Sequence, residues 1–146
     1  MDMIRRDTDY ALRLMANLAG RLGSAVVSSR ILASEEDISY QLACKLLQKL
    51  NTAGLVKSQM GPKGGFSLAK KASQITLEQV IEVIQGPVSV NCCLLGKKAC
   101  DRQSNCNISE KLTNLQDYIE GFLKSVTLKE LSVNSKSKKT SKKGTK

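Results

Sequence analysis

The stretch LLQKLNTAGLVKSQMGPKGGFSLAK, residues 46–70, decides the fold of this chain. Its first residues are the last turns of a predicted helix, which ends at Gly54. Residues 55–59 and 66–69 then show the alternation of apolar and polar residues that is typical of strands. One proline and three glycines lie among the six residues MGPKGG between the two runs, a strong signal for a hairpin turn. The stretch therefore predicts a helix followed by a two-stranded hairpin.

Upstream of this stretch, the periodicity predicts two further helices. Apolar residues recur at helical spacing over 8–22, after Thr8 as a candidate N-cap. Ser28 or Ser29 can cap a short second helix, and Ser39 can cap the third helix, which ends near residue 52. Three helices followed by a hairpin are the order of a winged helix-turn-helix, whose third helix enters the DNA major groove. The alternative is a general α+β domain whose hairpin binds nothing.

Downstream, two more helices are expected. Thr76 and Gln79 form a capping box for a helix that Gly86-Pro87 closes. A long helix with a continuous apolar stripe is predicted over 109–132, and its roughly 24 residues would span about 36 Å. A stripe of this length needs a partner surface, and the same helix in a second subunit is the expected partner. The alternative is that this helix folds back on its own domain.

These patterns predict a mainly α protein with a small β-hairpin, divided into four parts. They are a winged helix-turn-helix domain over 1–86, a cysteine-rich loop over 87–108, a dimerisation helix over 109–132 and a disordered lysine-rich tail over 133–146. The tail carries six lysines and no acid, so the remainder of the chain has a net charge of only +4 out of the total +10. This mild basicity is consistent with a nucleic-acid partner.

Composition excludes several classes of function. The 146 residues contain no histidine, which excludes histidine-based catalysis and histidine metal ligands. No nucleophile–base pair or phosphate-binding loop is recognisable, so an enzyme is not expected. No apolar run is long enough to span a membrane, and the N-terminus lacks the pattern of a signal peptide. We therefore expect a cytoplasmic protein with reduced thiols and no membrane partner.

Four of the five cysteines lie in the loop segment NCCLLGKKACDRQSNC, residues 91–106. Thiolates are the soft ligands that hold iron–sulfur clusters and zinc. The odd number of cysteines argues against a disulfide framework. A cysteine-rich loop in a small basic protein indicates a sensor whose metal state is read out elsewhere in the molecule.

Three stretches carry a resemblance to a known family. TDYALR (8–13), the hairpin stretch quoted above, and ITLEQVIEVIQGP (75–87) resemble the Rrf-type winged-helix transcription regulators, over residues 3 to about 131. The resemblance implies a homodimer that binds double-stranded DNA and is crossed at its long helices. In some members an iron–sulfur cluster is bound by three cysteines of the loop after the fourth helix.

The resemblance also implies a ligand set for this cluster. Cys93, Cys100 and Cys106 match the family's spacing with one extra residue in the first gap, and Cys92 is the alternative to Cys93. One member takes a histidine as fourth ligand, at the position that Ser109 occupies here.

A second member of the family takes the fourth ligand from an aspartate in the first helix of the other subunit. Asp9 falls on that position, and Asp7 is the fallback. The aspartate and the absence of histidine favour a 4Fe–4S over a 2Fe–2S cluster. Zinc is the structural alternative, although its sites usually show closely spaced cysteine pairs that this loop lacks.

The DNA contacts are expected on the third helix and the hairpin. Outward positions of the helix carry polar side chains that can reach base edges or phosphate: Ser39, Tyr40, Gln41 and Lys45. The hairpin offers two lysines and two backbone N–H groups to phosphate: Lys57, Lys63, Gly64 and Gly65. Met60 stands where many members of the family have an arginine that enters the minor groove, so we expect a different target. Three arginines near the first helix can add phosphate contacts: Arg5, Arg6 and Arg13.

The expected function is a transcription regulator or repressor whose operator binding is controlled by an iron–sulfur cluster. The cluster would sense redox state, nitric oxide or iron–sulfur status. The alternative is a repressor of the same fold that binds no cluster and responds through its thiols or a ligand.

Overall fold

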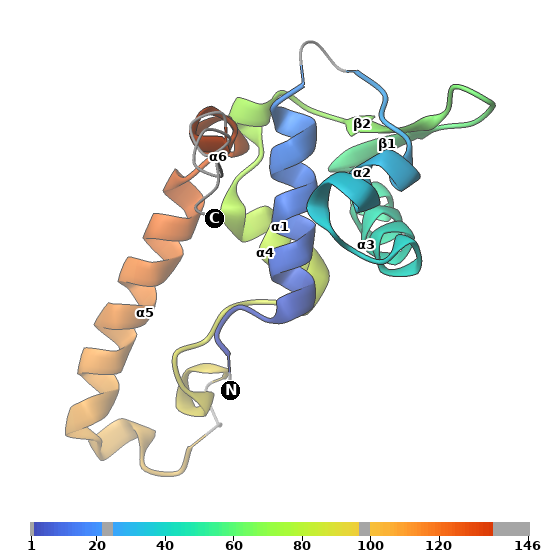
Figure 1. Ribbon diagram of the computed structural model, residues 1–146. Coiled ribbons are helices and arrows are strands. Elements are labelled where there is room, and N and C mark those ends of the chain that lie inside the picture. Colours follow the sequence, from blue (N-terminus) through green and yellow to red (C-terminus); the bar gives the residue numbers. More distant parts are fainter. Residues whose placement is uncertain (1, 22–24, 97–99, 136–146) are drawn as a thin grey trace, which may run out of the picture.

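The structure, a computed structural model, describes residues 2–21, 25–96 and 100–135 (Figure 1). Its elements confirm the predicted mainly helical fold with one hairpin and the order of a winged helix-turn-helix. They are α1 (Arg6–Ala19), α2 (Ser29–Glu36), α3 (Tyr40–Thr52), β1 (Val56–Gln59), β2 (Gly65–Leu68), α4 (Leu77–Gln85), α5 (Asn107–Ser125) and α6 (Leu128–Ser135). Three short 3-10 turns lie between them: η1 (Ala72–Gln74), η2 (Cys92–Leu94) and η3 (Gln103–Asn105).

Most of the predicted helix caps are confirmed. The Ser28 hydroxyl accepts from the N–H of Ile31, and Thr76 forms the predicted capping box with Gln79. Ser39 caps α3 in the same way as Ser28 caps α2. The predicted cap at Thr8 is wrong, because α1 begins at Arg6 and Thr8 is fully buried in its first turns.

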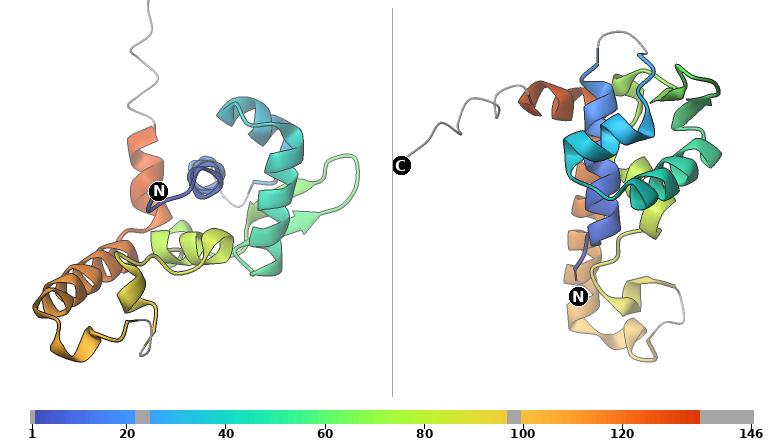
Figure 2. Two further views of the ribbon diagram at one scale, coloured as in Figure 1. Left: turned by 90° about the horizontal axis from the view of Figure 1, so that it is seen from below. Right: turned by 45° about the vertical axis from the view of Figure 1, so that its right-hand side comes forward.

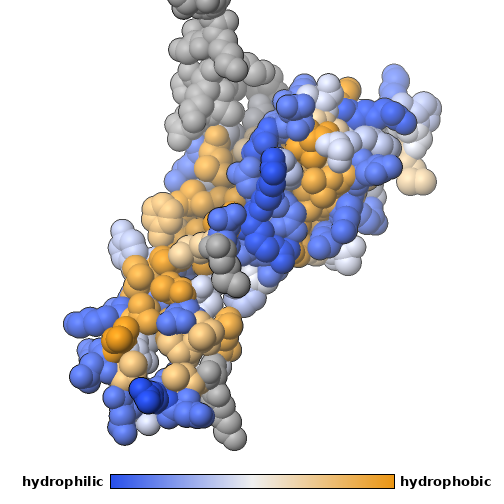
Figure 3. Space-filling view, turned by 60° about the horizontal axis from the view of Figure 1, so that its bottom comes forward, coloured by the Kyte–Doolittle hydropathy of each residue, from blue (hydrophilic) through white to orange (hydrophobic). Residues whose placement is uncertain are grey.

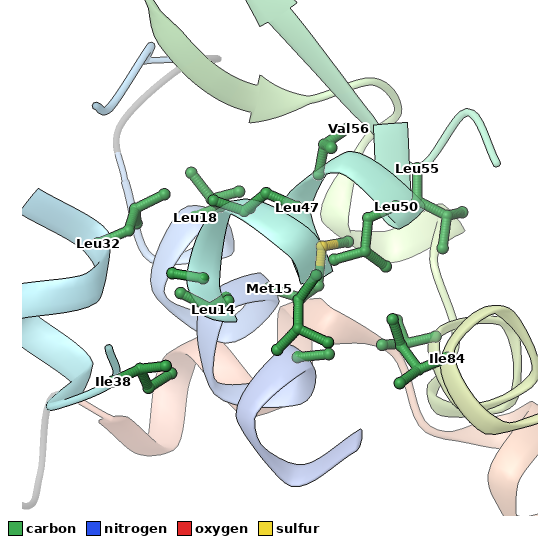
Figure 4. Close-up of a cluster of buried hydrophobic side chains, with 14 of the residues drawn as sticks. Leu14, Met15, Leu18, Leu32, Ile38, Leu47, Leu50, Leu55, Val56 and Ile84 are labelled. Atoms are coloured by element: carbon green, nitrogen blue, oxygen red, sulfur yellow. The ribbon is translucent and has the colours of Figure 1, made fainter. Parts of the chain in front are cut away.

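Helix α1 is the centre of the fold and contacts α2, α3, α4 and α6. Two views show it lying between α6 on one side and α3 on the other (Figures 1 and 2). Its buried face packs against the buried face of α3, and Ile84 of α4 adds to the same core (Figure 4). The labelled core residues from α1 and α3 are Leu14, Met15, Leu18, Leu47 and Leu50. A change in the tilt of α1 would therefore move α3.

The hairpin is attached to the segment that precedes α2. β1 and β2 pair antiparallel, from Val56 opposite Leu68 to Gln59 opposite Gly65. The backbones of Val27 and Phe66 exchange two hydrogen bonds, of 2.9 and 2.8 Å. These bonds give the hairpin a fixed direction relative to α2 and α3.

The predicted single helix over 109–132 is divided in the structure. α5 ends at Ser125, and residues 126–127 are extended beside the start of α4: the N–H of Leu77 donates to the carbonyl of Val126 at 3.0 Å. The N–H of Leu128 then donates to the carbonyl of Ile75 at 2.9 Å, and the fully buried Leu128 begins α6, which packs on α1. The last part of the predicted helix therefore folds back on its own domain, which was the alternative to pairing with a second subunit. Residues 133–135, predicted as disordered, belong to α6, and 136–146 lie outside the described residues.

Candidate functional site

The predicted recognition helix α3 presents the expected polar side chains to solvent. Tyr40, Gln41 and Lys45 are exposed on α3, and Ser39 is exposed at its N-cap. The opposite face of α3 is buried against α1 and carries Ala43, Leu46, Leu47 and Leu50. One face of α3 is therefore anchored in the core, and the other is available to a DNA groove.

An arginine that the sequence analysis missed lies beside this surface. Arg30, the second residue of α2, places its guanidinium carbon 4.6 Å from the ring centroid of Tyr40. Both side chains are exposed, Tyr40 to 44%. The sequence signals only a basic residue in the first turn of the second helix, because the contact with Tyr40 depends on how α2 and α3 pack.

The hairpin presents both predicted lysines to solvent, whereas the Gly64 N–H has a partner within the turn. Lys57 and Lys63 are exposed, and Met60 at the turn is 92% exposed. The N–H of Gly64 donates to the carbonyl of Gly61 at 2.9 Å, so it is engaged within the turn and is not free for phosphate. A Cβ on Gly64 or Gly65 would lie 2.2 Å from a backbone oxygen, which explains both glycines by close packing.

The three arginines of the first helix region are engaged within the chain. Arg5 pairs with Asp7 at 2.8 Å, and Arg6 donates to the Tyr10 hydroxyl at 2.9 Å. Arg13 binds Glu36 of α2. Phosphate contacts by these arginines would therefore compete with existing partners.

The cysteine loop is folded by its own hydrogen bonds. The Gln103 side chain donates to the carbonyl of Cys93 at 3.1 Å, which joins η2 to the segment before α5. Cys106 is the N-cap residue of α5. Cys92 is exposed, whereas Cys93, Cys100 and Cys106 are partly buried, and all are free thiols.

The donor groups of this loop suit a metal centre in type but not in spacing. Three free thiols on one loop are the donor chemistry that an iron–sulfur cluster requires. In the described part of the single chain, however, no three cysteine or carboxylate side chains are grouped closely enough to hold a metal ion. The donor types therefore fit, and binding would require the loop to draw its thiols together.

The two predicted aspartates differ in their surroundings. Asp9 is exposed on α1, whereas Asp7 is half-buried. The hydrogen bond from the Arg5 side chain lowers the pKa of Asp7, despite the opposing effect of partial burial. Asp7 therefore has a cationic partner in its own chain, which leaves Asp9 as the more accessible of the two carboxylates.

Two glutamine side chains anchor the ends of the segment that leads into the cysteine loop. Gln85, the last residue of α4, accepts from the Arg5 N–H at 2.9 Å and from the Thr8 hydroxyl at 2.7 Å. Its amide nitrogen donates to the carbonyl of Met3 at 2.9 Å. These bonds tie the end of α4 to the beginning of α1.

Gln116, buried on α5, makes the second anchor. It accepts from the N–H of Val90 at 2.9 Å and donates to the carbonyl of Val88 at 2.7 Å. The entrance to the cysteine loop is thus held between α1 and α5. A rearrangement of the loop would act on both helices.

The outer face of α5 carries an exposed apolar stripe. Ile108, Leu115, Tyr118 and Phe122 recur at helical spacing and are 45 to 73% exposed. Figure 3 shows hydrophobic side chains gathered on the arm that α5 and the cysteine loop form. A stripe of this length and exposure is typical of a helix that packs against another molecule.

Comparisons with known proteins agree with this geometry. Residues 4–134 match the model of the Rrf2 family, described as iron-dependent transcriptional regulators. The HTH-type transcriptional regulator IscR of Cronobacter sakazakii is 33% identical over 122 residues, which cover 84% of this chain and 75% of that protein.

Two solved structures show the same fold. The global cysteine regulator CymR of B. subtilis has a TM-score of 0.76 and 29% identity, over 92% of this chain and 98% of that one. The oxidised form of CymR from Staphylococcus aureus has a TM-score of 0.70 and 27% identity, over 90% and 96% of the two chains. In the described ranges, no helix is long and apolar enough to cross a membrane.

Proposed function

The chain belongs to the Rrf2 family of DNA-binding transcriptional regulators, and from this premise we propose that it is a homodimer whose operator binding is controlled by an iron–sulfur cluster. The observation that carries the proposal is the loop with three free, partly buried thiols, held between the DNA-binding domain and α5.

Cys93, Cys100 and Cys106 would hold the cluster, with Cys92 as the alternative to Cys93. Asp9 of the second subunit would be the fourth ligand, which favours a 4Fe–4S over a 2Fe–2S cluster. When bound, the cluster would supply a centre that reacts with small oxidising molecules, most readily at the corner held by a hard carboxylate.

Gln116 and Gln85 would transmit movement of the cysteine loop to the DNA-binding helices. Gln116 holds Val88 and Val90 on α5, so loop movement acts on α5 and on the end of α4. Gln85 passes movement of α4 to the first turn of α1. Since α1 packs directly on α3, the orientation of the recognition helix changes with it. In a dimer, this would alter the separation of the two recognition helices, which must match half-sites about one DNA turn apart.

The dimer is proposed from the apolar stripe of α5. Pairing of the two stripes would bury Leu115, Tyr118 and Phe122, which are otherwise about half or more exposed. Ligation by Asp9 would require this pairing to bring α1 of each subunit within reach of the other subunit's loop.

The test is a purification without oxygen, followed by visible absorbance, iron and sulfide counts, and operator affinity before and after iron chelation. The operator is a duplex selected from a random library with the same protein. Cys106→Ser should lose the absorbance, whereas Cys44→Ser on α3 is the matched control and should keep it. Full absorbance and iron content in Cys106→Ser would refute its role as ligand, and identical operator affinity with and without iron would refute the regulation.

A second candidate is a regulator of the same fold that binds no cluster and responds through its thiols. It is supported by the likeness to the global cysteine regulator CymR of B. subtilis and to the oxidised form of CymR from Staphylococcus aureus. It is also supported by the described part of the chain, where no three cysteine or carboxylate side chains are grouped closely enough to hold a metal ion. Protein that is colourless after oxygen-free purification, yet releases DNA on thiol oxidation, would favour this candidate. A cytoplasmic location and the four-part division of the chain remain predictions.

A further inference from the structure

We propose that Arg30, held in position by Tyr40, is a DNA phosphate contact that sets the register of the recognition helix. The proposal rests on the DNA-binding function of the family and does not depend on the cluster. Arg30 is a positioning residue in this scheme, because it would carry no sequence information itself.

The first argument is the position of Arg30 in the helix-turn-helix. It is the second residue of α2, in the first turn, two residues after the N-cap Ser28. In a helix-turn-helix, the helix before the recognition helix crosses the DNA backbone. An exposed side chain at this end of α2, beside the first residue of α3, would therefore meet phosphate next to the groove that α3 enters.

The second argument is the availability of its charge. Arg5, Arg13 and Arg21 each form a salt bridge within the chain. No carboxylate lies within salt-bridge distance of Arg30 in residues 2–21, 25–96 and 100–135. The two acids at the far end of α2, Glu35 and Glu36, are engaged by Arg21 and Arg13. Among the described residues, Arg30 is therefore an exposed guanidinium with no competing carboxylate.

The third argument is preorganisation. The guanidinium lies 4.6 Å from the Tyr40 ring centroid, well inside the range of a cation–π contact. A guanidinium stacked in this way loses little further freedom when its planar N–H groups bind phosphate oxygens. The role expected for Tyr40 is thus to support Arg30 with its ring, rather than to use its hydroxyl.

The experiment measures DNA affinity against salt concentration for a duplex selected from a random library and for a shuffled duplex of the same composition. Arg30→Ala should weaken binding to both duplexes by roughly tenfold or more. It should also lower the slope of log affinity against log salt by about 0.9 for each phosphate released, or about 1.8 for a dimer. Arg30→Lys should keep the slope but lose several-fold in affinity, because lysine neither stacks nor binds bidentately.

Two further variants test the support from the ring. Tyr40→Leu should weaken binding several-fold, and Tyr40→Phe, which keeps the ring, should weaken binding less than Tyr40→Leu. Lys129→Ala is the matched control: it removes the same charge from an exposed position on α6, across α1 from α3, and should leave the slope unchanged. Circular dichroism of each variant establishes that it is folded.

The inference fails if folded Arg30→Ala keeps the salt slope of the unsubstituted protein. It also fails if the loss is confined to one base pair of the selected duplex, since that would make Arg30 a base contact. Failure of the unsubstituted protein to bind any duplex would instead remove the DNA-binding premise, and the two failures are therefore distinguishable.

Discussion

Replacing Gln85 by leucine should lower the free energy of unfolding by about 2 kcal/mol. The Gln85 side chain makes three hydrogen bonds at the junction of α1 and α4, to Arg5, Thr8 and Met3. Of these partners, only Thr8 is fully buried, so its hydroxyl would lose its acceptor at a cost of about 1–3 kcal/mol. The backbone groups of Met3 and Arg5 belong to exposed residues and can turn to water, so their loss adds little.

The assay is urea unfolding followed by circular dichroism, at one fixed protein concentration because a dimer's stability depends on concentration. Thr8→Val is the matched second variant, since it removes the hydroxyl that Gln85→Leu leaves without a partner. The double variant should be no less stable than Gln85→Leu alone, because replacing both partners by apolar groups can be nearly neutral.

Two results would refute this reasoning. The first is a loss below about 0.5 kcal/mol in Gln85→Leu, which is smaller than the cost of an unpaired buried hydroxyl. The second is strict additivity of the two single substitutions, which would show that the residues are not coupled. If the proposed function is right, Gln85→Leu should also reduce the ratio of operator affinities measured with and without iron.

Three further predictions concern other parts of the molecule. Phe122→Asp on the apolar stripe of α5 should convert the proposed dimer to a folded monomer in light scattering, and a variant that stays dimeric would remove α5 from the interface. Leu128→Ala should destabilise the protein by about 2–5 kcal/mol in urea unfolding, because it leaves a cavity where α6 docks, and a loss below about 1 kcal/mol would contradict that docking. The lowered pKa of Asp7 means that its pair with Arg5 stabilises the fold above pH about 4 and is lost as pH falls through the folded-state pKa. Between pH 5 and 3, the free energy of unfolding of the unsubstituted protein should therefore fall slightly more than that of Asp7→Asn. The difference should be less than about 1 kcal/mol, because the pair is partly exposed. Equal losses in the two proteins would contradict the pairing.

The exposed face of α3 could be predicted because it depends on local patterns. The exposed side of α3 follows from its helical period, and its cap at Ser39 is a short-range signal. Arg30 could not be assigned in this way, because its partner Tyr40 lies on another helix and the contact exists only when α2 and α3 are packed.

The glycines of the hairpin show the same limit. The turn itself was evident from its composition, whereas the donation from Gly64 to Gly61 within that turn was not. A glycine in a predicted turn has a backbone N–H that no side chain covers, but only the folded turn determines which acceptor that N–H uses.

The cysteine loop was located from the sequence, since four cysteines within one short segment need no tertiary information. Its attachment was not predictable, because Gln85 and Gln116 are ordinary polar residues whose partners lie far away along the chain. The distances between the thiols in a cluster-bound protein likewise depend on the tertiary conformation of the loop.

The sequence by itself determined the order of helices and hairpin, the caps of α2, α3 and α4, and the place of the thiol-bearing loop. Each depends on residues within one or two turns of each other, where periodicity, capping and turn chemistry act. Only the tertiary structure decided where the C-terminal helix divides. The apolar period continues through Val126, but backbone bonds to Ile75 and Leu77 hold this segment extended, and burial of Leu128 turns α6 back onto α1. Those bonds join residues that are distant along the chain, so no local pattern could record them.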